Sequence, residues 1–221
     1  GEIYCIVCGR KTKKAFAEGL CYPCFMNSTE NSPCIIRPEL CEAHLGKGRD
    51  MEWETKNHLQ SHYVYLALTS AVKVGVTRST NLVHRWIDQG AWKGIPLCLT
   101  NNRYEAGIIE VSFKSHITDK TNWQQMLKDL RYDIDLKAKR EELLKFLDPQ
   151  FSQFVVNNPE LTEIVYPVQK YPTSVKSVNL EKSPDFKSTL AGIRGQYLIF
   201  IDNSVLNIRS HSGFKVNISV N

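Results

Sequence analysis

The segment HYVYLALTSAVKVGVTRSTNLVHRWIDQGA, residues 62–91, combines two strand patterns with one helix pattern. Residues 63–68 are aromatic and aliphatic, which predicts a strand. Residues 72–77 alternate apolar and other residues and predict a second strand after a short turn. Such a hairpin would place Tyr65, Lys73 and the open space over Gly75 on one surface. Glycine inside a strand often marks the close approach of a ligand or another backbone.

A short helix should follow over residues 82–89, with Asn81 as its N-cap and Gly90 just past its end. Its apolar face consists of leucine, valine, tryptophan and isoleucine side chains, and Arg85 lies at one edge of that face.

The next helix should begin at Asn102, where Glu105 is placed as the partner in a capping box. Glu110 lies beside the apolar stripe of this helix, one turn after Ala106 and Gly107. These small residues would let the helix approach the sheet and bring Glu110 inward.

The chain after this helix consists of a charged helical segment followed by a segment of short strands. Residues 119–123 should cap a long charged helix over 122–147, which Pro149 ends. Residues 162–168, 174–179, 196–201, 205–209 and 214–220 read as strands of a small all-β unit. Arg194, Arg209 and His211 fall in its glycine-containing loops and offer an anion or base site, or are scaffold residues.

The N-terminus carries the strongest motif of the sequence. The spacing CxxC-x12-CxxC supplies four soft ligands for tetrahedral zinc, at Cys5, Cys8, Cys21 and Cys24. Few apolar residues lie between the pairs, so this segment should need the metal to fold. Four basic residues between the pairs either contact phosphates or form a solvated face: Arg10, Lys11, Lys13 and Lys14.

A second group of ligand-type residues follows, with less diagnostic spacing. Cys34 and Cys41 are its expected ligands, completed by His44 and His58, with His62 as a weaker candidate. The alternative is a pair of buried thiols with surface histidines.

Composition narrows the classes of protein without selecting one. The 221 residues are 42% hydrophobic, and the net charge of +5 permits a polyanionic partner without requiring one. No apolar run is long enough to cross a membrane, and no apolar leader opens the sequence. Seven cysteines without such a leader favour metal ligation in the reducing cytoplasm over disulfides.

The central motifs resemble those of the GIY-YIG nuclease superfamily. Residues 64–66 and 73–77 stand where that superfamily pairs its two motif strands, although Val64 replaces the first glycine and Lys73 the second tyrosine. The resemblance implies that Tyr65, Arg85 and Glu110 are catalytic and that Glu110 holds one divalent ion, Mg²⁺ or Mn²⁺. It also matches Gly75 to the glycine of the second motif and Asn122 to an asparagine present in some members.

The implied chemistry is cleavage of phosphodiester bonds in DNA or RNA. Arg85 would bind a non-bridging oxygen, and Tyr65, helped by Lys73, would orient or deprotonate water. Gly75, Thr77 and Arg78 would face the substrate. The alternatives are a core aromatic at Tyr65, an ion pair between Arg85 and Asp88, and an ion pair between Glu110 and Lys114.

Nearly the whole chain also resembles a bacterial zinc-containing family of unknown function with a GIY-YIG-like core. The resemblance is carried by the cysteine-rich start and by the motifs RWIDQGA, DKTNW, IRGQYLIF and VLNIR.

Together these patterns predict an α+β protein with a small antiparallel sheet and flanking helices. The expected parts are a zinc-binding module over 1–60, a GIY-YIG-like core over 61–150 and a β unit over 151–221. Three functions stay open: a metal-dependent nuclease, an inactive nucleic-acid-binding protein and a zinc-stabilised protein-interaction module. The sequence does not decide the oligomeric state.

Overall fold

The computed structural model describes residues 1–117, 122–132 and 134–220. The chain forms two compact units, Ser32–Tyr166 and a unit that joins Gly1–Asn31 to Pro167–Asn221. The two cysteine groups therefore belong to different units, a division that cuts across the three sequence ranges expected above.

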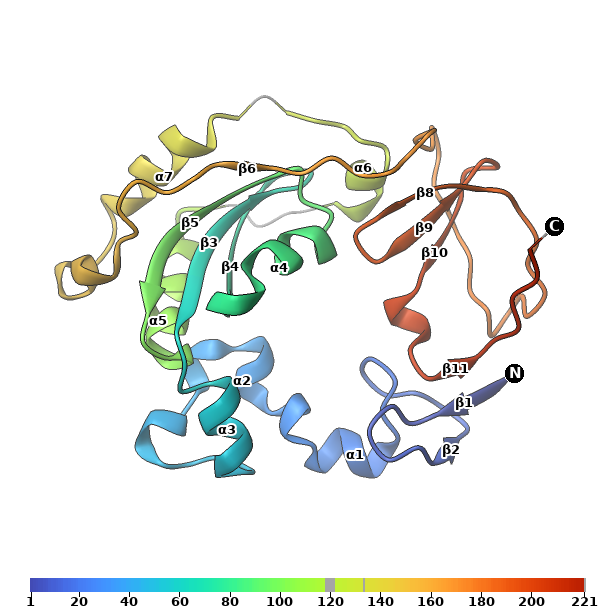
Figure 1. The fold of residues 1–221 in the computed structure, drawn as a ribbon, viewed down its shortest axis with the longest axis horizontal. Coiled ribbons are helices and arrows are strands. Elements are labelled where there is room, and N and C mark those ends of the chain that lie inside the picture. The colour runs from blue at the N-terminus through green and yellow to red at the C-terminus, as the bar shows by residue number, and fades with distance from the viewer. Residues whose placement is uncertain (118–121, 133, 221) are drawn as a thin grey trace. The chain divides into compact units, whose positions relative to one another are not determined.

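The larger unit is built on a four-stranded antiparallel sheet, visible in Figure 1. Its order is β4-β3-β5-β6, with β4 at Val72–Arg78, β3 at His62–Leu68, β5 at Lys93–Thr100 and β6 at Thr162–Glu163. Strands β3 and β4 confirm the predicted hairpin, and their register places Tyr65 opposite Gly75.

Strand β5 was not among the predicted elements, and it contains Pro96. A proline cannot donate to a strand ladder and is tolerated at irregular positions. The register between β3 and β5 shifts between Val64 and Tyr65, where Tyr65 stands opposite Pro96. This irregularity accommodates the proline in a central strand.

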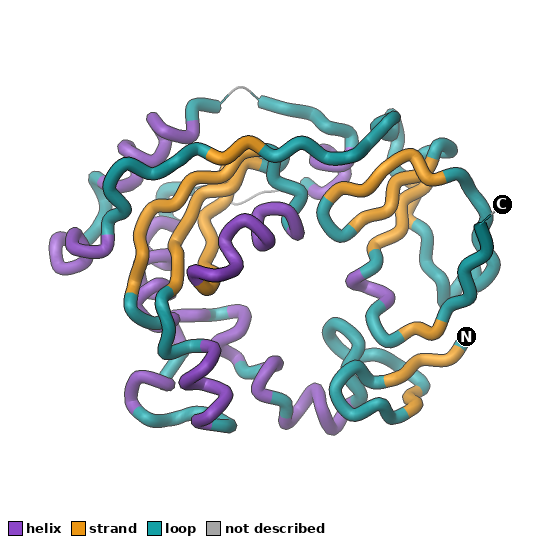
Figure 2. Tube along the Cα trace, in the orientation of Figure 1, coloured by secondary structure: helices purple, strands orange, loops and turns teal. Residues whose placement is uncertain are grey.

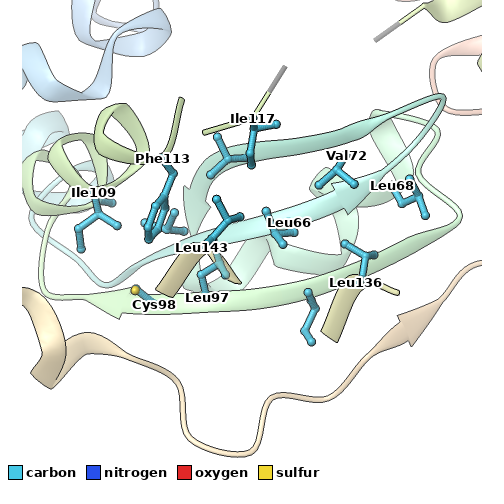
Figure 3. Packing of buried hydrophobic residues seen from close by; sticks show 14 of the residues in the cluster. Leu66, Leu68, Val72, Leu97, Cys98, Ile109, Phe113, Ile117, Leu136 and Leu143 are labelled. Atoms are coloured by element: carbon cyan, nitrogen blue, oxygen red, sulfur yellow. The ribbon is translucent and has the colours of Figure 1, made fainter. Parts of the chain in front are cut away.

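Helices cover both faces of this sheet. Helix α4, Leu82–Asp88, packs Trp86 beside Tyr65 and Ala67 on one face. Helices α5, Arg103–Lys114, and α7, Leu136–Leu144, pack on the opposite face. Figure 3 shows the main core there, formed by strand residues such as Leu66 and Leu97 with Ile109, Phe113, Leu136 and Leu143.

The start of α5 is as predicted, whereas the start of α4 differs. The Asn102 side chain accepts a hydrogen bond from the Glu105 amide, 3.0 Å away, at the beginning of α5. Asn81 makes no capping hydrogen bond, because a 3-10 turn over Ser79–Asn81 leads into α4 instead. Gly90 has a positive φ of 70°, as expected for the residue that ends the helix.

The single long helix expected over 122–147 is wrong. The structure has α6 at Trp123–Leu127 and α7 at Leu136–Leu144. The chain leaves the helical path at Asp129, whose φ of 54° is left-handed. Residues 119–121 of the expected cap lie outside the described residues. Pro149 opens a separate 3-10 segment, Pro149–Phe154.

Short helical segments connect the second cysteine group to the sheet. They are α2 at Pro33–Ile36, η2 at Pro38–Leu40, η3 at Ala43–Leu45 and α3 at Met51–Asn57. Segment η2 packs directly on α5 at Gly107, where an added Cβ would lie 2.2 Å from the Glu39 backbone nitrogen. The small residue at 107 therefore lets η2, rather than the sheet, approach the helix.

The other unit contains two small sheets, and Figure 2 shows their short strands. In the first, β1 at Glu2–Tyr4 lies between β2 at Lys11–Thr12 and β11 at Phe214–Lys215. The second has the order β7-β10-β9-β8, with these strands at Lys176–Ser177, Ser204–Asn207, Tyr197–Phe200 and Leu190–Arg194. Helix α1, Tyr22–Asn27, and the 3-10 turn Thr29–Asn31 complete the N-terminal part.

Several strand predictions need correction here. The strand expected at 162–168 is only Thr162–Glu163, and it pairs with β5 in the larger unit. The strand expected at 214–220 pairs with β1 over Phe214–Lys215 only. Strand β8 was not predicted, and β7 pairs with β10 in parallel.

Candidate metal centres and catalytic cluster

The first centre brings together the four cysteines of the CxxC pairs. Cys5 and Cys8 lie at the turn after β1, and Cys21 and Cys24 lie at the start of α1. One sulfur from each residue falls within 4.8 Å of the others, and Cys8 Sγ is 3.7 Å from Cys21 Sγ. Four thiol sulfurs at this spacing fit a tetrahedral zinc ion.

The electrostatics of Cys5 agree with a thiolate ligand. Burial by itself raises the pKa of Cys5, but hydrogen bonds from the backbone at Cys21, Cys8 and Val7 lower it to about 6. Backbone amides directed at a sulfur stabilise its anionic form, the form that binds a metal.

The second centre contains Cys34, Cys41 and His58, which lie within 4.8 Å of one another through one ligand atom each. His58 Nδ1 is 4.0 Å from Cys34 Sγ and 3.7 Å from Cys41 Sγ. Hydrogen bonding with Cys34 and His58 lowers the pKa of Cys41. This arrangement is compatible with zinc.

The other two histidines of that motif lie outside the three-residue group. His44 is exposed, and its ring stacks on Tyr104 with centroids 4.3 Å apart. His62 is fully buried; its Nδ1 lies 2.7 Å from the Gln60 carbonyl oxygen. Its Nε2 has no hydrogen-bond partner among the described residues.

Tyr65 is the centre of the candidate catalytic cluster. Its side chain is fully buried, and its ring lies over Gly75, where an added Cβ would be 2.6 Å from the hydroxyl oxygen. Gln89 Nε2 donates a hydrogen bond to that oxygen at 2.9 Å. The glycine predicted to face an approaching group therefore faces Tyr65 itself.

Arg85 and Glu110 both influence the pKa of Tyr65. Burial raises the pKa of Tyr65, Arg85 and Gln89 lower it, and the charge of Glu110 raises it further. Arg85 on α4 and Glu110 on α5 thus each lie within electrostatic reach of Tyr65 on β3.

Glu110 is a buried carboxylate that forms an ion pair with a lysine. Only 8% of the residue is exposed, and Lys114 Nζ lies 3.2 Å from Oε2. Oε2 has no partner other than Lys114 among the described residues. Burial raises the pKa of Glu110, Lys114 opposes that effect, and Glu39 adds to it.

The remaining predicted site residues are dispersed. Lys73 is half-buried opposite Ala67, and Thr77 is buried on the same strand. Arg78 Nη1 donates to Asn57 Oδ1 at 2.7 Å. The Asn122 side chain caps α6 by accepting from the Gln124 and Gln125 amides.

The basic residues of the N-terminal hairpin are all exposed: Arg10, Lys11, Lys13 and Lys14. Lys11 pairs with Glu2, and Lys14 Nζ lies 5.3 Å from the centroid of the Phe16 ring.

The C-terminal residues predicted to lie in loops have internal contacts, although Arg194 belongs to β8 and Arg209 and His211 to a 3-10 turn. Arg209 pairs with Glu18, and Arg194 lies 5.8 Å from the Tyr171 ring centroid. His211 Nε2 accepts a hydrogen bond from the Leu180 amide.

Four residues beside these sites were not predicted: Gln89, Arg103, Glu54 and Glu39. Arg103 donates from Nε to the Cys34 carbonyl at 2.9 Å and from Nη2 to the Ile35 carbonyl at 2.8 Å. Gln89 stands one turn from Arg85 on a predicted helix, so helical spacing was sufficient to find it. Glu54 stands one turn from His58, but on a helix that the sequence did not predict.

Comparison with known proteins adds the family. The model of a family described as a protein of unknown function, DUF2797, matches residues 1–216. The chain belongs to the DUF2797 family. The comparisons with curated proteins and with solved structures each gave no match. Among the described residues of this DUF2797 member, no helix is both long and apolar enough to cross a membrane.

Proposed function

We propose that this DUF2797 protein is a zinc-stabilised nuclease that cleaves phosphodiester bonds with a divalent cation held by Glu110. The proposal is carried by the position of Tyr65, which lies over Gly75, accepts a hydrogen bond from Gln89 and has its pKa shifted by both Arg85 and Glu110. The burial of the Glu110 carboxylate beside Lys114 supports it, because a bound cation would further offset the cost of burying this charge.

Each residue has a role suited to its chemistry. Glu110 would hold Mg²⁺ or Mn²⁺, which stabilises charge on the phosphate and on the leaving oxygen. Arg85 offers a planar pair of donors to a non-bridging phosphate oxygen. The Tyr65 hydroxyl orients the attacking water. Burial raises the pKa of Tyr65, so its hydroxyl needs assistance from another group to deprotonate the water. We propose that the half-buried Lys73 gives this assistance.

A second candidate is nucleic-acid binding without cleavage. Tyr65 is fully buried, and its hydroxyl already accepts from Gln89. Glu110 is paired with Lys114. Both contacts must open before water and a cation can reach these groups. A protein that only binds nucleic acid could keep both contacts closed.

The test is a titration of Mg²⁺ or Mn²⁺ into the zinc-loaded protein with labelled single- and double-stranded DNA and RNA. Glu110→Gln removes the proposed cation ligand at nearly constant shape, and Arg85→Ala removes the phosphate donor. Glu160→Gln changes an exposed glutamate of the same unit and serves as the charge-matched control.

Cleavage by the wild type and by Glu160→Gln, but by neither site variant, supports the nuclease. Salt-dependent binding without cleavage supports the second candidate. Absence of both leaves the third expectation, a zinc-stabilised protein-interaction module.

A further inference from the structure

We propose that the second metal centre is a closed, four-ligand zinc site in which Glu54 is the fourth ligand beside Cys34, Cys41 and His58. The proposal is independent of the nuclease function. It replaces His44, the ligand expected from the sequence, with a residue that the cysteine and histidine pattern did not include.

The three grouped ligands already have the spacing of a metal site. A tetrahedral ion with bonds of about 2.0–2.3 Å separates its ligand atoms by about 3.3–3.8 Å. His58 Nδ1 lies 3.7 Å from one sulfur and 4.0 Å from the other. The nitrogen that faces both sulfurs is also the one that Glu54 Oε2 contacts. An ion bound among these atoms would hold the carboxylate oxygen and the imidazole nitrogen apart as two of its ligands.

The local fold directs Glu54 toward this point. Glu54 and His58 are four residues apart at the end of α3, so their side chains lie on the same side of the helix. The backbone of Gly48 closes over the glutamate: an added Cβ at Gly48 would lie 2.4 Å from Glu54 Cγ. Asp50 fixes the start of the helix by accepting from the Glu52 and Trp53 amides.

Burial indicates a closed site. Cys34 is 8% exposed, Cys41 2%, His58 2% and Glu54 3%. A catalytic zinc ion needs an open coordination position for water or substrate, whereas a structural ion has four protein ligands. A buried carboxylate is costly unless a cation compensates it, and the proposed ion supplies that charge.

The charges balance when Arg103 is included. Zinc with two thiolates, one carboxylate and a neutral imidazole carries a net charge of −1. The Arg103 guanidinium lies beside the centre, donating to the Cys34 and Ile35 carbonyls, and the Arg103 amide donates to the His58 carbonyl at 2.9 Å. Such outer contacts orient the ligands of a metal.

His62 is the competing fourth ligand. Its Nδ1 is fixed by the Gln60 carbonyl, and its buried Nε2 has no hydrogen-bond partner among the described residues, a pattern that also suits a metal-binding histidine. Both Glu54 and His62 lie outside the three-residue group within 4.8 Å, and Glu54 is favoured because its carboxylate contacts the ligand atom of His58. Water is the third alternative.

The experiment measures zinc content and affinity in the full-length protein, with the Cys5 centre as the internal reference. Zinc is counted by mass spectrometry and titrated against a chromophoric chelator. Cobalt then replaces zinc, and its absorption reports the ligands. The variants are Glu54→Gln, His62→Gln and, as a matched control on the same helix, the exposed Glu52→Gln.

The wild type should bind two zinc ions. Glu54→Gln should weaken one of them by more than about 100-fold, beyond the 10–100-fold typical of changes outside the ligand shell. The same variant should shift the cobalt spectrum of that centre alone, while Glu52→Gln and His62→Gln retain the wild-type affinity and spectrum.

Loss on His62→Gln with retention on Glu54→Gln would overturn the proposal in favour of histidine. Wild-type zinc affinity in both variants would overturn the proposal and indicate water as the fourth ligand. A single zinc ion in the wild type would show that the second centre binds no metal.

Discussion

Replacing Gly75 by alanine tests how the sheet holds Tyr65. The new Cβ would lie 2.6 Å from the Tyr65 hydroxyl oxygen and 2.8 Å from Cζ, both closer than a Cβ contact allows. The ring cannot swing away freely, because it is fully buried and packs edge-on against Trp86 with centroids 6.0 Å apart. Overpacking of this kind costs about 1–3 kcal/mol. For a chain of this length that corresponds to a melting temperature lower by about 2–12 °C.

The assay is thermal unfolding of zinc-loaded protein, with Tyr65→Phe and the double variant measured alongside. Tyr65→Phe alone loses the hydrogen bond from Gln89, worth about 1 kcal/mol. The double variant should be more stable than the sum of the single losses by at least about 0.5 kcal/mol, because the shorter ring relieves part of the overlap. A Gly75→Ala protein within about 0.5 kcal/mol of the wild type would refute the reasoning.

Three further predictions follow from the same structure. Burial lowers the pKa of His62 from 6.5 to about 4, so between these pH values the unfolded chain binds a proton that the folded chain does not. The free energy of unfolding should therefore fall by up to about 1.4 kcal/mol per pH unit as the pH is lowered from 6.5 toward 4. Denaturant titrations should show a weaker dependence of this free energy on pH for His62→Gln. Gly107→Ala should destabilise the larger unit by about 1–3 kcal/mol, because the new Cβ meets the Glu39 backbone at 2.2 Å; a loss below about 0.5 kcal/mol in denaturant titration would contradict this packing. Cys21→Ser should remove one zinc ion and leave the centre at Cys41 loaded, because the two centres belong to different compact units; simultaneous loss of both ions in mass spectrometry would contradict their independence.

Local sequence patterns were sufficient to predict the β3–β4 hairpin and the two helices that follow it, α4 and α5. The alternation at Val72, Val74 and Val76 depends only on neighbouring residues, and these side chains do face the main core. The four-cysteine centre was also visible from spacing alone, because tetrahedral coordination constrains the sequence directly.

Tertiary pairing accounts for most of what was missed. Strand β5 was not predicted, and its Pro96 is accommodated by the irregular pairing with β3. The N-terminal strand β1 pairs with β11, more than two hundred residues away, and no local pattern reports such a partner. The break near Asp129 interrupts a segment whose charged residues are good helix formers.

The candidate site shows the same division. Tyr65, Arg85 and Glu110 were named from motif resemblance, whereas the surroundings of Glu110 include residues distant in sequence, such as Glu39 beside α5. In the second metal centre, His44 had a plausible spacing but stacks on Tyr104, while Glu54 reaches His58 through the geometry of α3.

The most direct test of the proposed function is to measure Mn²⁺ binding at Glu110. Electron paramagnetic resonance would monitor this binding in zinc-loaded protein with an oligonucleotide present. We predict one bound Mn²⁺ in the wild type and in Glu160→Gln, and none in Glu110→Gln. Equal Mn²⁺ binding by the wild type and Glu110→Gln would contradict the assignment of Glu110 as the cation ligand.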